Sequence, residues 1–292
     1  MRRILITGGT GVIGKAVIEK LPKDISVILL TRNFKYFSES KNVKVKLFNF
    51  EKSKALPPNL WNATEILHMA GATHEVNPKV YYSINTDFTK YLVELSEKNK
   101  IERFTYISTQ TASIKGGAYS ISKFFAEKII VNSSLDWTIV RPSEVYGHEI
   151  DSMVSKLCKI INKSPIVPII GNGMYSLNPV HIQDLSNFIV KLVTSNSNLA
   201  FKKIYTLCGP SPIPFINFCK SYASYQNKKI FFIKIPVFVC KALVKFINAT
   251  GIHVILVDQI DRLIINKCHD NSLAFNDYGY RPCTFNFLIN TH

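Results

Sequence analysis

Short apolar runs alternate with helix-like segments along the first half of the chain. Residues 3–7 form an apolar run, a glycine-rich turn follows, and residues 11–21 repeat apolar side chains with helical spacing until Pro22. The same patterns predict further strands at 26–30, 43–48, 65–69, 104–108 and 137–140, and helices at 81–99 and 118–131. Small or polar residues follow each strand, as at the carboxyl edge of a parallel sheet. The alternation predicts an α/β fold with a Rossmann-type doubly wound parallel sheet.

The pattern becomes less regular after Gly147. The second half contains two proline-bearing loops and one helical stretch, at 164–168, 210–214 and 236–248. We therefore expect a dinucleotide-binding Rossmann domain over residues 1–147, with further core strands from about 176–208. Residues 148–292 are expected to form mainly a smaller C-terminal lobe that binds substrate.

The turn after the first strand has the arrangement Gly-x-x-Gly-x-x-Gly, with Gly8, Gly11 and Gly14. The first glycine permits the tight turn, the second lets a pyrophosphate approach the backbone, and the third allows close packing. The helix that follows supplies amide donors and a positive dipole to the phosphates. This strand, turn and helix predict a dinucleotide site in which the cofactor is held by Thr7, Gly8, Thr10, Gly11, Val12, Ile13 and Gly14.

The end of the second strand bears on the choice of dinucleotide. NAD-binding folds usually place an acidic residue there, whereas this chain has Arg32. A guanidinium pairs with a 2′-phosphate that a carboxylate would repel, so Arg32, assisted by Lys35, favours NADP over NAD. The alternative is that Arg32 is only a solvated loop cation.

Tyr119 and Lys123 stand four residues apart at the start of a predicted helix and therefore share one face. A phenol has an ordinary pKa near 10, and a neighbouring ammonium lowers it by stabilising the phenolate. The pair therefore suits proton transfer near neutral pH. On its own this spacing also occurs in simple surface pairs.

Together with the glycine turn, several segments resemble the extended branch of the short-chain dehydrogenase/reductase family, specifically its nucleotide-sugar epimerases, dehydratases and reductases. The resemblance covers nearly the whole chain. The segments that carry it, besides the turn and the Tyr-Lys pair, are 68–72, 85–86, 103–109, 140–147, 179–185 and 279–282.

The resemblance implies a role for each polar residue of the expected site. Tyr119 is the general acid and base at the substrate oxygen, and Lys123 lowers the tyrosine pKa while holding the nicotinamide ribose. Thr109 hydrogen-bonds the reacting carbonyl, with Ser108 as the adjacent candidate. The resemblance also assigns cofactor contacts to Ala70, Gly71, Ala72, Pro142 (beside the nicotinamide) and Asn49 (near the adenine).

The chain departs from the family in the length of one loop. The family usually has a long loop between its paired hydroxyls and the tyrosine, whereas residues 110–118 here are only a short connection. One wall of the substrate pocket must therefore be built differently or left open. The missing acid after the second strand is the other departure.

Composition adds a strong positive charge, a formal +16 over 292 residues. This charge favours phosphate-rich partners such as nucleotides, nucleotide-linked substrates or an anionic surface, although a lysine-rich compositional habit explains it equally. No binding of nucleic acid is expected.

The six cysteines form no Cys-x-x-Cys pair and no zinc spacing, so reduced thiols and no metal are expected. An apolar run starts within three residues of Met1, which predicts a cytoplasmic protein without a signal peptide.

Other residues carry weaker predictions. His68 and His181 are expected to brace loops, while His74 and His148 have no partner readable from the sequence. Asp184 is expected to cap or anchor a helix of the second lobe. The segment 171–176 resembles one that approaches the nucleotide in the family but lacks the usual basic residue. The basic, apolar stretch 234–245 fits packing of the lobe or weak contact with an anionic membrane.

These observations predict an NADP(H)-dependent oxidoreductase that acts on a nucleoside-diphosphate sugar, most readily as a 4-keto-sugar reductase with a Thr, Tyr and Lys site. A nucleotide-sugar epimerase or dehydratase that retains NAD(P) is the alternative. A non-catalytic NADP-binding regulator or assembly subunit is the second alternative. A homodimer remains open.

Overall fold

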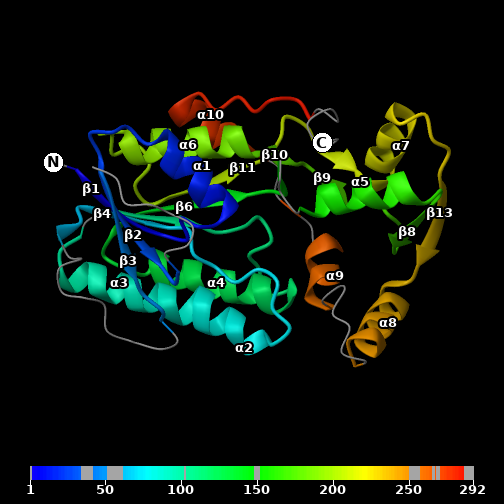
Figure 1. Cartoon of the computed structure of the whole chain (residues 1–292), viewed down its shortest axis with the longest axis horizontal. Coiled ribbons are helices and arrows are strands. Elements are labelled where there is room, and N and C mark those ends of the chain that lie inside the picture. Colours follow the sequence, from blue (N-terminus) through cyan, green and yellow to red (C-terminus); the bar gives the residue numbers. More distant parts are fainter. Residues whose placement is uncertain are drawn as a thin grey trace.

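Seven parallel strands form the central sheet (Figure 1). The computed structural model describes residues 2–33, 42–50, 62–101, 103–147, 152–249, 257–264, 267 and 270–285. The strands of the sheet are β1 (Arg3–Thr7), β2 (Ser26–Thr31), β3 (Val43–Leu47), β4 (Glu65–His68), β5 (Arg103–Ile107), β6 (Asp136–Pro142) and β11 (Lys203–Leu207). Their order, β11-β6-β5-β4-β1-β2-β3, changes direction between β1 and β4. The predicted doubly wound sheet is confirmed.

Helices cover both faces of this sheet (Figure 1). One face carries α1 (Val12–Lys20), α6 (Ile182–Thr194) and α10 (Ser272–Tyr278), and the other carries α3 (Phe88–Lys98) and α4 (Gly117–Val131). The helix predicted over 81–99 is a continuous stretch of α2 (Pro78–Tyr81), the π-helical η3 (Tyr82–Asp87) and α3. In β1, Ile4 and Ile6 join the core under α1 and α6, while Leu5 joins the opposite core. Strand β1 is therefore buried on both sides, which explains its continuous apolar sequence.

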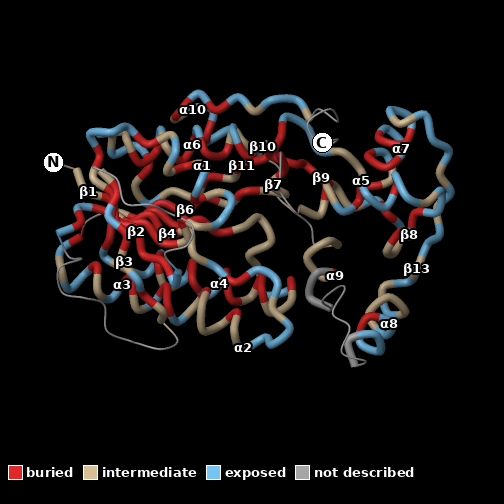
Figure 2. The backbone as a smooth tube through the Cα atoms, in the orientation of Figure 1, coloured by how far each residue is buried: buried red, intermediate tan, exposed pale blue. Residues whose placement is uncertain are grey.

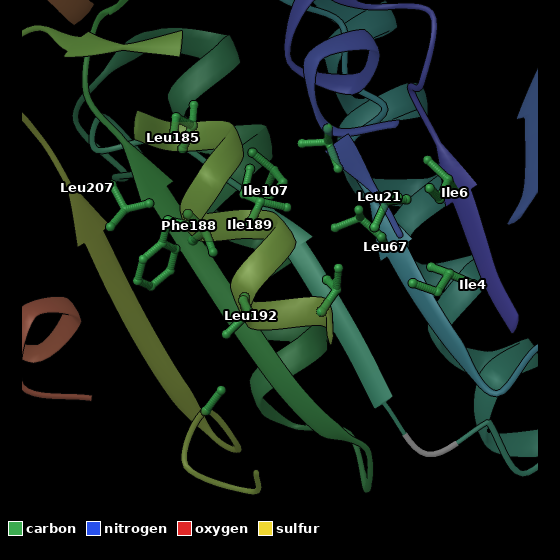
Figure 3. Close-up of a cluster of buried hydrophobic side chains, with 14 of the residues drawn as sticks. Ile4, Ile6, Leu21, Leu67, Ile107, Leu185, Phe188, Ile189, Leu192 and Leu207 are labelled. Atoms are coloured by element: carbon green, nitrogen blue, oxygen red, sulfur yellow. The ribbon is translucent and has the colours of Figure 1, made fainter. Parts of the chain in front are cut away.

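Helix α6 supplies much of one core. Its apolar residues Leu185, Phe188, Ile189 and Leu192 repeat at helical spacing and point toward the sheet (Figure 3). The prediction that Asp184 anchors a helix of the second lobe was wrong about the place, because this apolar stripe seats α6 on the large sheet. Asp184 there accepts a hydrogen bond from the backbone N–H of Cys283 at 2.9 Å.

The remaining elements form a second group beyond the edge of the sheet (Figure 1). They are β7 (Val145–Tyr146), α5 (Met153–Lys163), β8 (Ile166–Ile170), β9 (Ser176–Leu177), β10 (Val180–His181), β12 (Ile213–Pro214), α7 (Phe215–Tyr225), β13 (Phe231–Ile235), α8 (Val237–Ala249) and α9 (Val257–Ile264). Helices α5 and α7 share a core with β8 through side chains that include Leu157, Val167 and Phe218. The division of the chain at residues 147 and 148 stays a prediction.

The second half differs most from the sequence prediction. The expected loop 164–168 ends inside strand β8, which pairs in parallel with β13. Pro168 lies in β8 because this two-stranded sheet leaves the far edge of the strand unpaired, so no ladder bond needs its missing N–H. The helix near 236–248 is confirmed as α8. In the described ranges, the helices are too short or too polar to cross a bilayer.

Candidate active site

A cleft lies at the carboxyl ends of β1, β2, β3 and β4, where the strand order changes direction. Its volume is about 430 Å³. Predicted cofactor residues from all four strand ends line it: Thr7, Gly8, Thr10, Gly11, Arg32, Asn49, Ala70, Gly71 and Ala72. This is the place where doubly wound sheets bind ligands.

The glycine turn shapes the floor of this dinucleotide cleft. Gly8 has φ +73°, and a Cβ there would lie 2.4 Å from the backbone nitrogen of Ala70. A Cβ on Gly14 would lie 2.4 Å from the carbonyl oxygen of Gly8. At Gly11 only that same oxygen is near, at 3.3 Å, so Gly11 leaves open space. Gly11 is the N-cap of α1, and no described side chain caps this end of the helix. The first amides of α1 are therefore available to a ligand, and the cradle fits a phosphate group.

A buried hydrogen-bond chain braces the loop after β4. The N–H of Ala70 donates to the Thr7 hydroxyl, which lies 2.6 Å from Nδ1 of His68. Nε2 of His68 lies 2.9 Å from the Thr89 hydroxyl, and that hydroxyl donates to the carbonyl oxygen of Asn85. The chain is satisfied when His68 is neutral and carries its proton on Nε2. Burial and the nearby Lys123 charge lower the pKa of His68 to about 3, which agrees with a bracing role.

Asn85 holds the next part of the same loop. It accepts a hydrogen bond from the N–H of Ala72 at 2.8 Å and donates to the carbonyl oxygen of Ala72 and to the Ser122 hydroxyl. These bonds tie the cleft wall to α4. Gly71 lies close above Lys123, because a Cβ on Gly71 would be 3.2 Å from Nζ.

The mouth of the cleft carries Arg32, from which we predict a preference for NADP. Arg32 is exposed and follows β2 directly, and Asn49 lies across from it after β3. The side-chain oxygen of Thr31 accepts a hydrogen bond from the N–H of Asn33 and so fixes the turn that presents Arg32. Lys35 lies outside the described residues.

A second pocket, of about 220 Å³, adjoins the dinucleotide cleft. Thr109, Tyr119 and Pro142 line it, and His74 lines both cavities. Thr109 accepts a hydrogen bond from the N–H of Thr111 at 3.3 Å and lies 3.2 Å from its hydroxyl. Ser108 is buried instead, which favours Thr109 as the hydroxyl that meets substrate.

Helix α4 places Tyr119 and Lys123 on one buried face. Nζ of Lys123 donates to the carbonyl oxygen of Ile107 at 2.9 Å and lies 4.5 Å from the centre of the Tyr106 ring. Burial lowers the pKa of Lys123 to about 7, against the opposing charge of Glu127. Tyr119 borders the pocket, and its ring lies edge-on to that of Tyr81 at 5.8 Å.

Basic side chains from distant parts of the chain close the second pocket. Lys156 comes from α5 and Arg262 from α9. The guanidinium carbon of Arg262 lies 4.4 Å from the centre of the Tyr119 ring, and the group donates to the carbonyl oxygen of Thr73. Lys267 forms an ion pair with Glu144 on another wall. Cations therefore outnumber carboxylates around this pocket.

Gln110 offers unused polar capacity to the same pocket. Both atoms of its amide are buried and have no hydrogen-bond partner among the described residues. Buried polar atoms are normally paired, so this amide is suited to the hydroxyl groups of a ligand.

Not every predicted site residue lies in the dinucleotide cleft. Val12, Ile13 and Gly14 continue into α1, while Tyr119 and Pro142 line only the second pocket. Sequence reasoning did not find Gln110, Glu144 or the basic residues. Gln110 and Glu144 could have been found, because each lies just beyond a strand end that was predicted. Arg262 and Lys267 come from a segment without a local signal.

The remaining predicted residues lie apart from both cavities. His181 caps α6 by accepting the N–H of Gln183, and its pKa is lowered chiefly by burial. The segment 171–176 meets the start of α8. His148 lies outside the described residues. Among the residues that the structure describes, no three His, Cys, Asp or Glu side chains form a group that could hold a metal ion.

Comparison with known proteins identifies several relatives, among them a protein named as an NADH dehydrogenase subunit and an epimerase. A Dictyostelium discoideum protein named NADH dehydrogenase (ubiquinone) 1 alpha subcomplex subunit 9, mitochondrial, is 24% identical over 70% of this chain. The match spans 58% of that relative's length. UDP-glucose 4-epimerase of Vibrio cholerae is 21% identical over 96% of this chain and 91% of its own.

A solved structure agrees with the fold. UDP-glucuronic acid 4-epimerase of Bacillus cereus, in complex with UDP-glucuronic acid and NAD, superposes with a TM-score of 0.72 at 16% identity, over 97% of this chain and 95% of its own. Residues 4–208 also match the NAD dependent epimerase/dehydratase family. Since this match covers most of the chain, and the glycine cradle suits a nicotinamide dinucleotide, the chain belongs to the NAD-dependent epimerase/dehydratase family.

Proposed function

We propose that the protein is an NADP(H)-dependent oxidoreductase of nucleoside-diphosphate sugars, acting as a 4-keto-sugar reductase. One observation carries the proposal: a pocket bordered by Tyr119 and Thr109 adjoins the dinucleotide cleft at His74. Lys123 lies beneath the loop that separates them. A site for hydride transfer and a site for proton transfer are therefore neighbours.

Reduction of the sugar carbonyl requires a hydride and a proton. The bound nicotinamide would supply the hydride. The Tyr119 hydroxyl donates a proton to the oxygen of the sugar carbonyl as that oxygen gains charge, and Thr109 donates a hydrogen bond to the same oxygen. The ammonium form of Lys123 stabilises the Tyr119 phenolate that remains. The guanidinium of Arg262, against the Tyr119 ring, adds a second cation that favours this phenolate.

The pocket's charge supports an anionic substrate. Lys156 and Arg262 face it from α5 and α9, while Lys267 is already paired with Glu144. The positive charge of Lys156 and Arg262 suits the diphosphate of a nucleotide sugar. Gln110 and Glu144 then provide hydrogen-bonding groups for the sugar hydroxyls.

Arg32 supports the choice of reductase over epimerase. A reductase consumes NADPH, whereas an epimerase returns its cofactor to the starting state. A guanidinium at the mouth of the cleft favours the 2′-phosphate that distinguishes NADPH. The epimerase relative keeps the redox-neutral reaction as the alternative.

A second candidate function is that of a dinucleotide-binding assembly subunit, favoured by the relative named as a subunit of NADH dehydrogenase. Such a subunit needs the cleft but not the proton-transfer pocket. The presence of Tyr119, Lys123 and Thr109 together supports catalysis instead.

The experiment is to incubate the purified protein with NADPH and a panel of nucleotide-linked 4-keto sugars, and to follow both cofactor absorbance and sugar products. Loss of NADPH in step with the reduced sugar is the result expected of a reductase. Sugar inversion without net loss of NADPH would identify an epimerase. Cofactor binding without turnover of any sugar would favour the assembly subunit.

A further inference from the structure

Helix α8 presents an apolar face to solvent. Phe238 is 75% exposed, Phe246 is 72% exposed and Leu243 is 51% exposed. These three residues are called the α8 apolar face. The opposite side of the helix packs inward through the buried Val244. Packing of the lobe therefore explains only one side of this stretch.

The strand before α8 continues the exposed apolar surface. Phe231 and Ile233 of β13 are exposed, and so are their partners Ile166 and Pro168 in β8. Figure 2 shows α8 and β13 mainly in the colours of exposed and intermediate residues, at the end of the molecule far from the buried sheet. Exposed large apolar side chains gathered in one region mark a candidate interaction site.

The charge of this part of the chain indicates the partner. From residue 185 to residue 257 the sequence contains nine lysines and no Asp or Glu. Lys234, in β13 just before α8, and Lys245, within α8, are both exposed. Lys241 is the exception, because it pairs with Asp261 of α9 at 2.5 Å. An anionic surface is thus the electrostatic complement of this region.

We propose that the α8 apolar face, together with Lys234 and Lys245, docks this protein on a bilayer that contains anionic phospholipids. Phenylalanine and leucine on one side of a surface helix, accompanied by lysines, match a helix that lies in the plane of the bilayer interface. The phenylalanines enter the boundary of the acyl chains, and the lysines contact the headgroup phosphates. This contact does not depend on the proposed reaction.

The test is sedimentation of the full chain with vesicles of phosphatidylcholine alone and with vesicles that also contain phosphatidylglycerol. We expect binding to the anionic vesicles, weakened by high salt. The double variant Phe238→Ser/Phe246→Ser should bind at least about tenfold more weakly. Lys234→Gln and Lys245→Gln should each weaken binding about fivefold, on anionic vesicles only. Phe125→Ser, on the exposed side of α4, is the matched control and should bind like the wild type.

Each opposite result overturns the proposal. Absence of binding to anionic vesicles, or equal binding by the double variant, removes the lipid as the partner. A dimer in sedimentation velocity that becomes a monomer in the double variant would show that a second copy covers the face. A fall in melting temperature beyond that of Phe125→Ser would show that the phenylalanines pack within the chain.

Discussion

Replacing Lys123 by Met should stabilise the folded protein near neutral pH. The amine is buried, and its pKa is lowered from 10.5 to about 7. One pKa unit corresponds to about 1.4 kcal/mol. Below about pH 7, where Lys123 is protonated in both the folded and the unfolded chain, this shift therefore lowers the free energy of unfolding of the wild type by about 5 kcal/mol. Met keeps the length of the side chain without the charge.

Several contacts offset part of this gain. The variant loses the hydrogen bond to Ile107 and the contact with the Tyr106 ring, each about 1 kcal/mol. Glu127 keeps its ion pair with Arg141, so no unpaired charge is left in the core. The net expectation for Lys123→Met is about 2–3 kcal/mol of added stability at about pH 6.5.

The effect should depend on pH in a defined direction. Between about pH 7 and 10.5 the unfolded chain binds a proton at Lys123 that the folded chain does not, so wild-type stability rises with pH. The advantage of Lys123→Met should therefore shrink to near zero by about pH 9.5. Urea unfolding at several pH values measures it, with Lys128→Met, exposed on the same helix, as the matched control. A variant less stable than wild type at about pH 6.5, or an advantage that does not shrink, would refute the reasoning.

Three further predictions concern the dinucleotide cleft. Gly14→Ala should lower the free energy of unfolding by about 3 kcal/mol in thermal unfolding, because the new Cβ would lie 2.4 Å from the backbone. Gly11→Ala should fold normally and bind NADPH at least about tenfold more weakly. Arg32→Glu should weaken NADPH binding in fluorescence titration and leave NADH binding unchanged; equal losses for both would contradict the role of Arg32. As the pH is lowered from about 6.5 to 3, the wild type should lose stability relative to His68→Asn, because His68 is protonated only in the unfolded chain in that range. Curves of unfolding free energy against pH that run parallel for the two proteins would contradict this prediction.

The sheet and the glycine cradle could be read from the sequence because both depend on local patterns. A parallel strand buried on both faces needs a continuous apolar run, as in Ile4 to Ile6, and the turn needs glycine at Gly8 and Gly14. Tyr119 and Lys123 were placed on one face because helical spacing fixes their relation. These are short-range constraints.

The walls of the substrate pocket could not be read in the same way. Arg262 reaches the Tyr119 ring across a separation of 143 residues, and nothing in the neighbours of either residue encodes that contact. Strand β8 could not be predicted because it contains Pro168, and proline normally marks a loop. It is tolerated here because it lies at the unpaired edge of a two-stranded sheet. Tertiary packing decided both features.

The most direct test of the central claim compares the rates of NADPH oxidation by the wild type and by Tyr119→Phe, with a nucleotide-linked 4-keto sugar as substrate. The NADPH affinity of both proteins is measured in parallel. The account predicts that the wild type oxidises NADPH and that the variant loses at least about a hundredfold in rate while its cofactor affinity is unchanged. A variant that oxidises NADPH as fast as the wild type would contradict the assignment of Tyr119 as the proton donor.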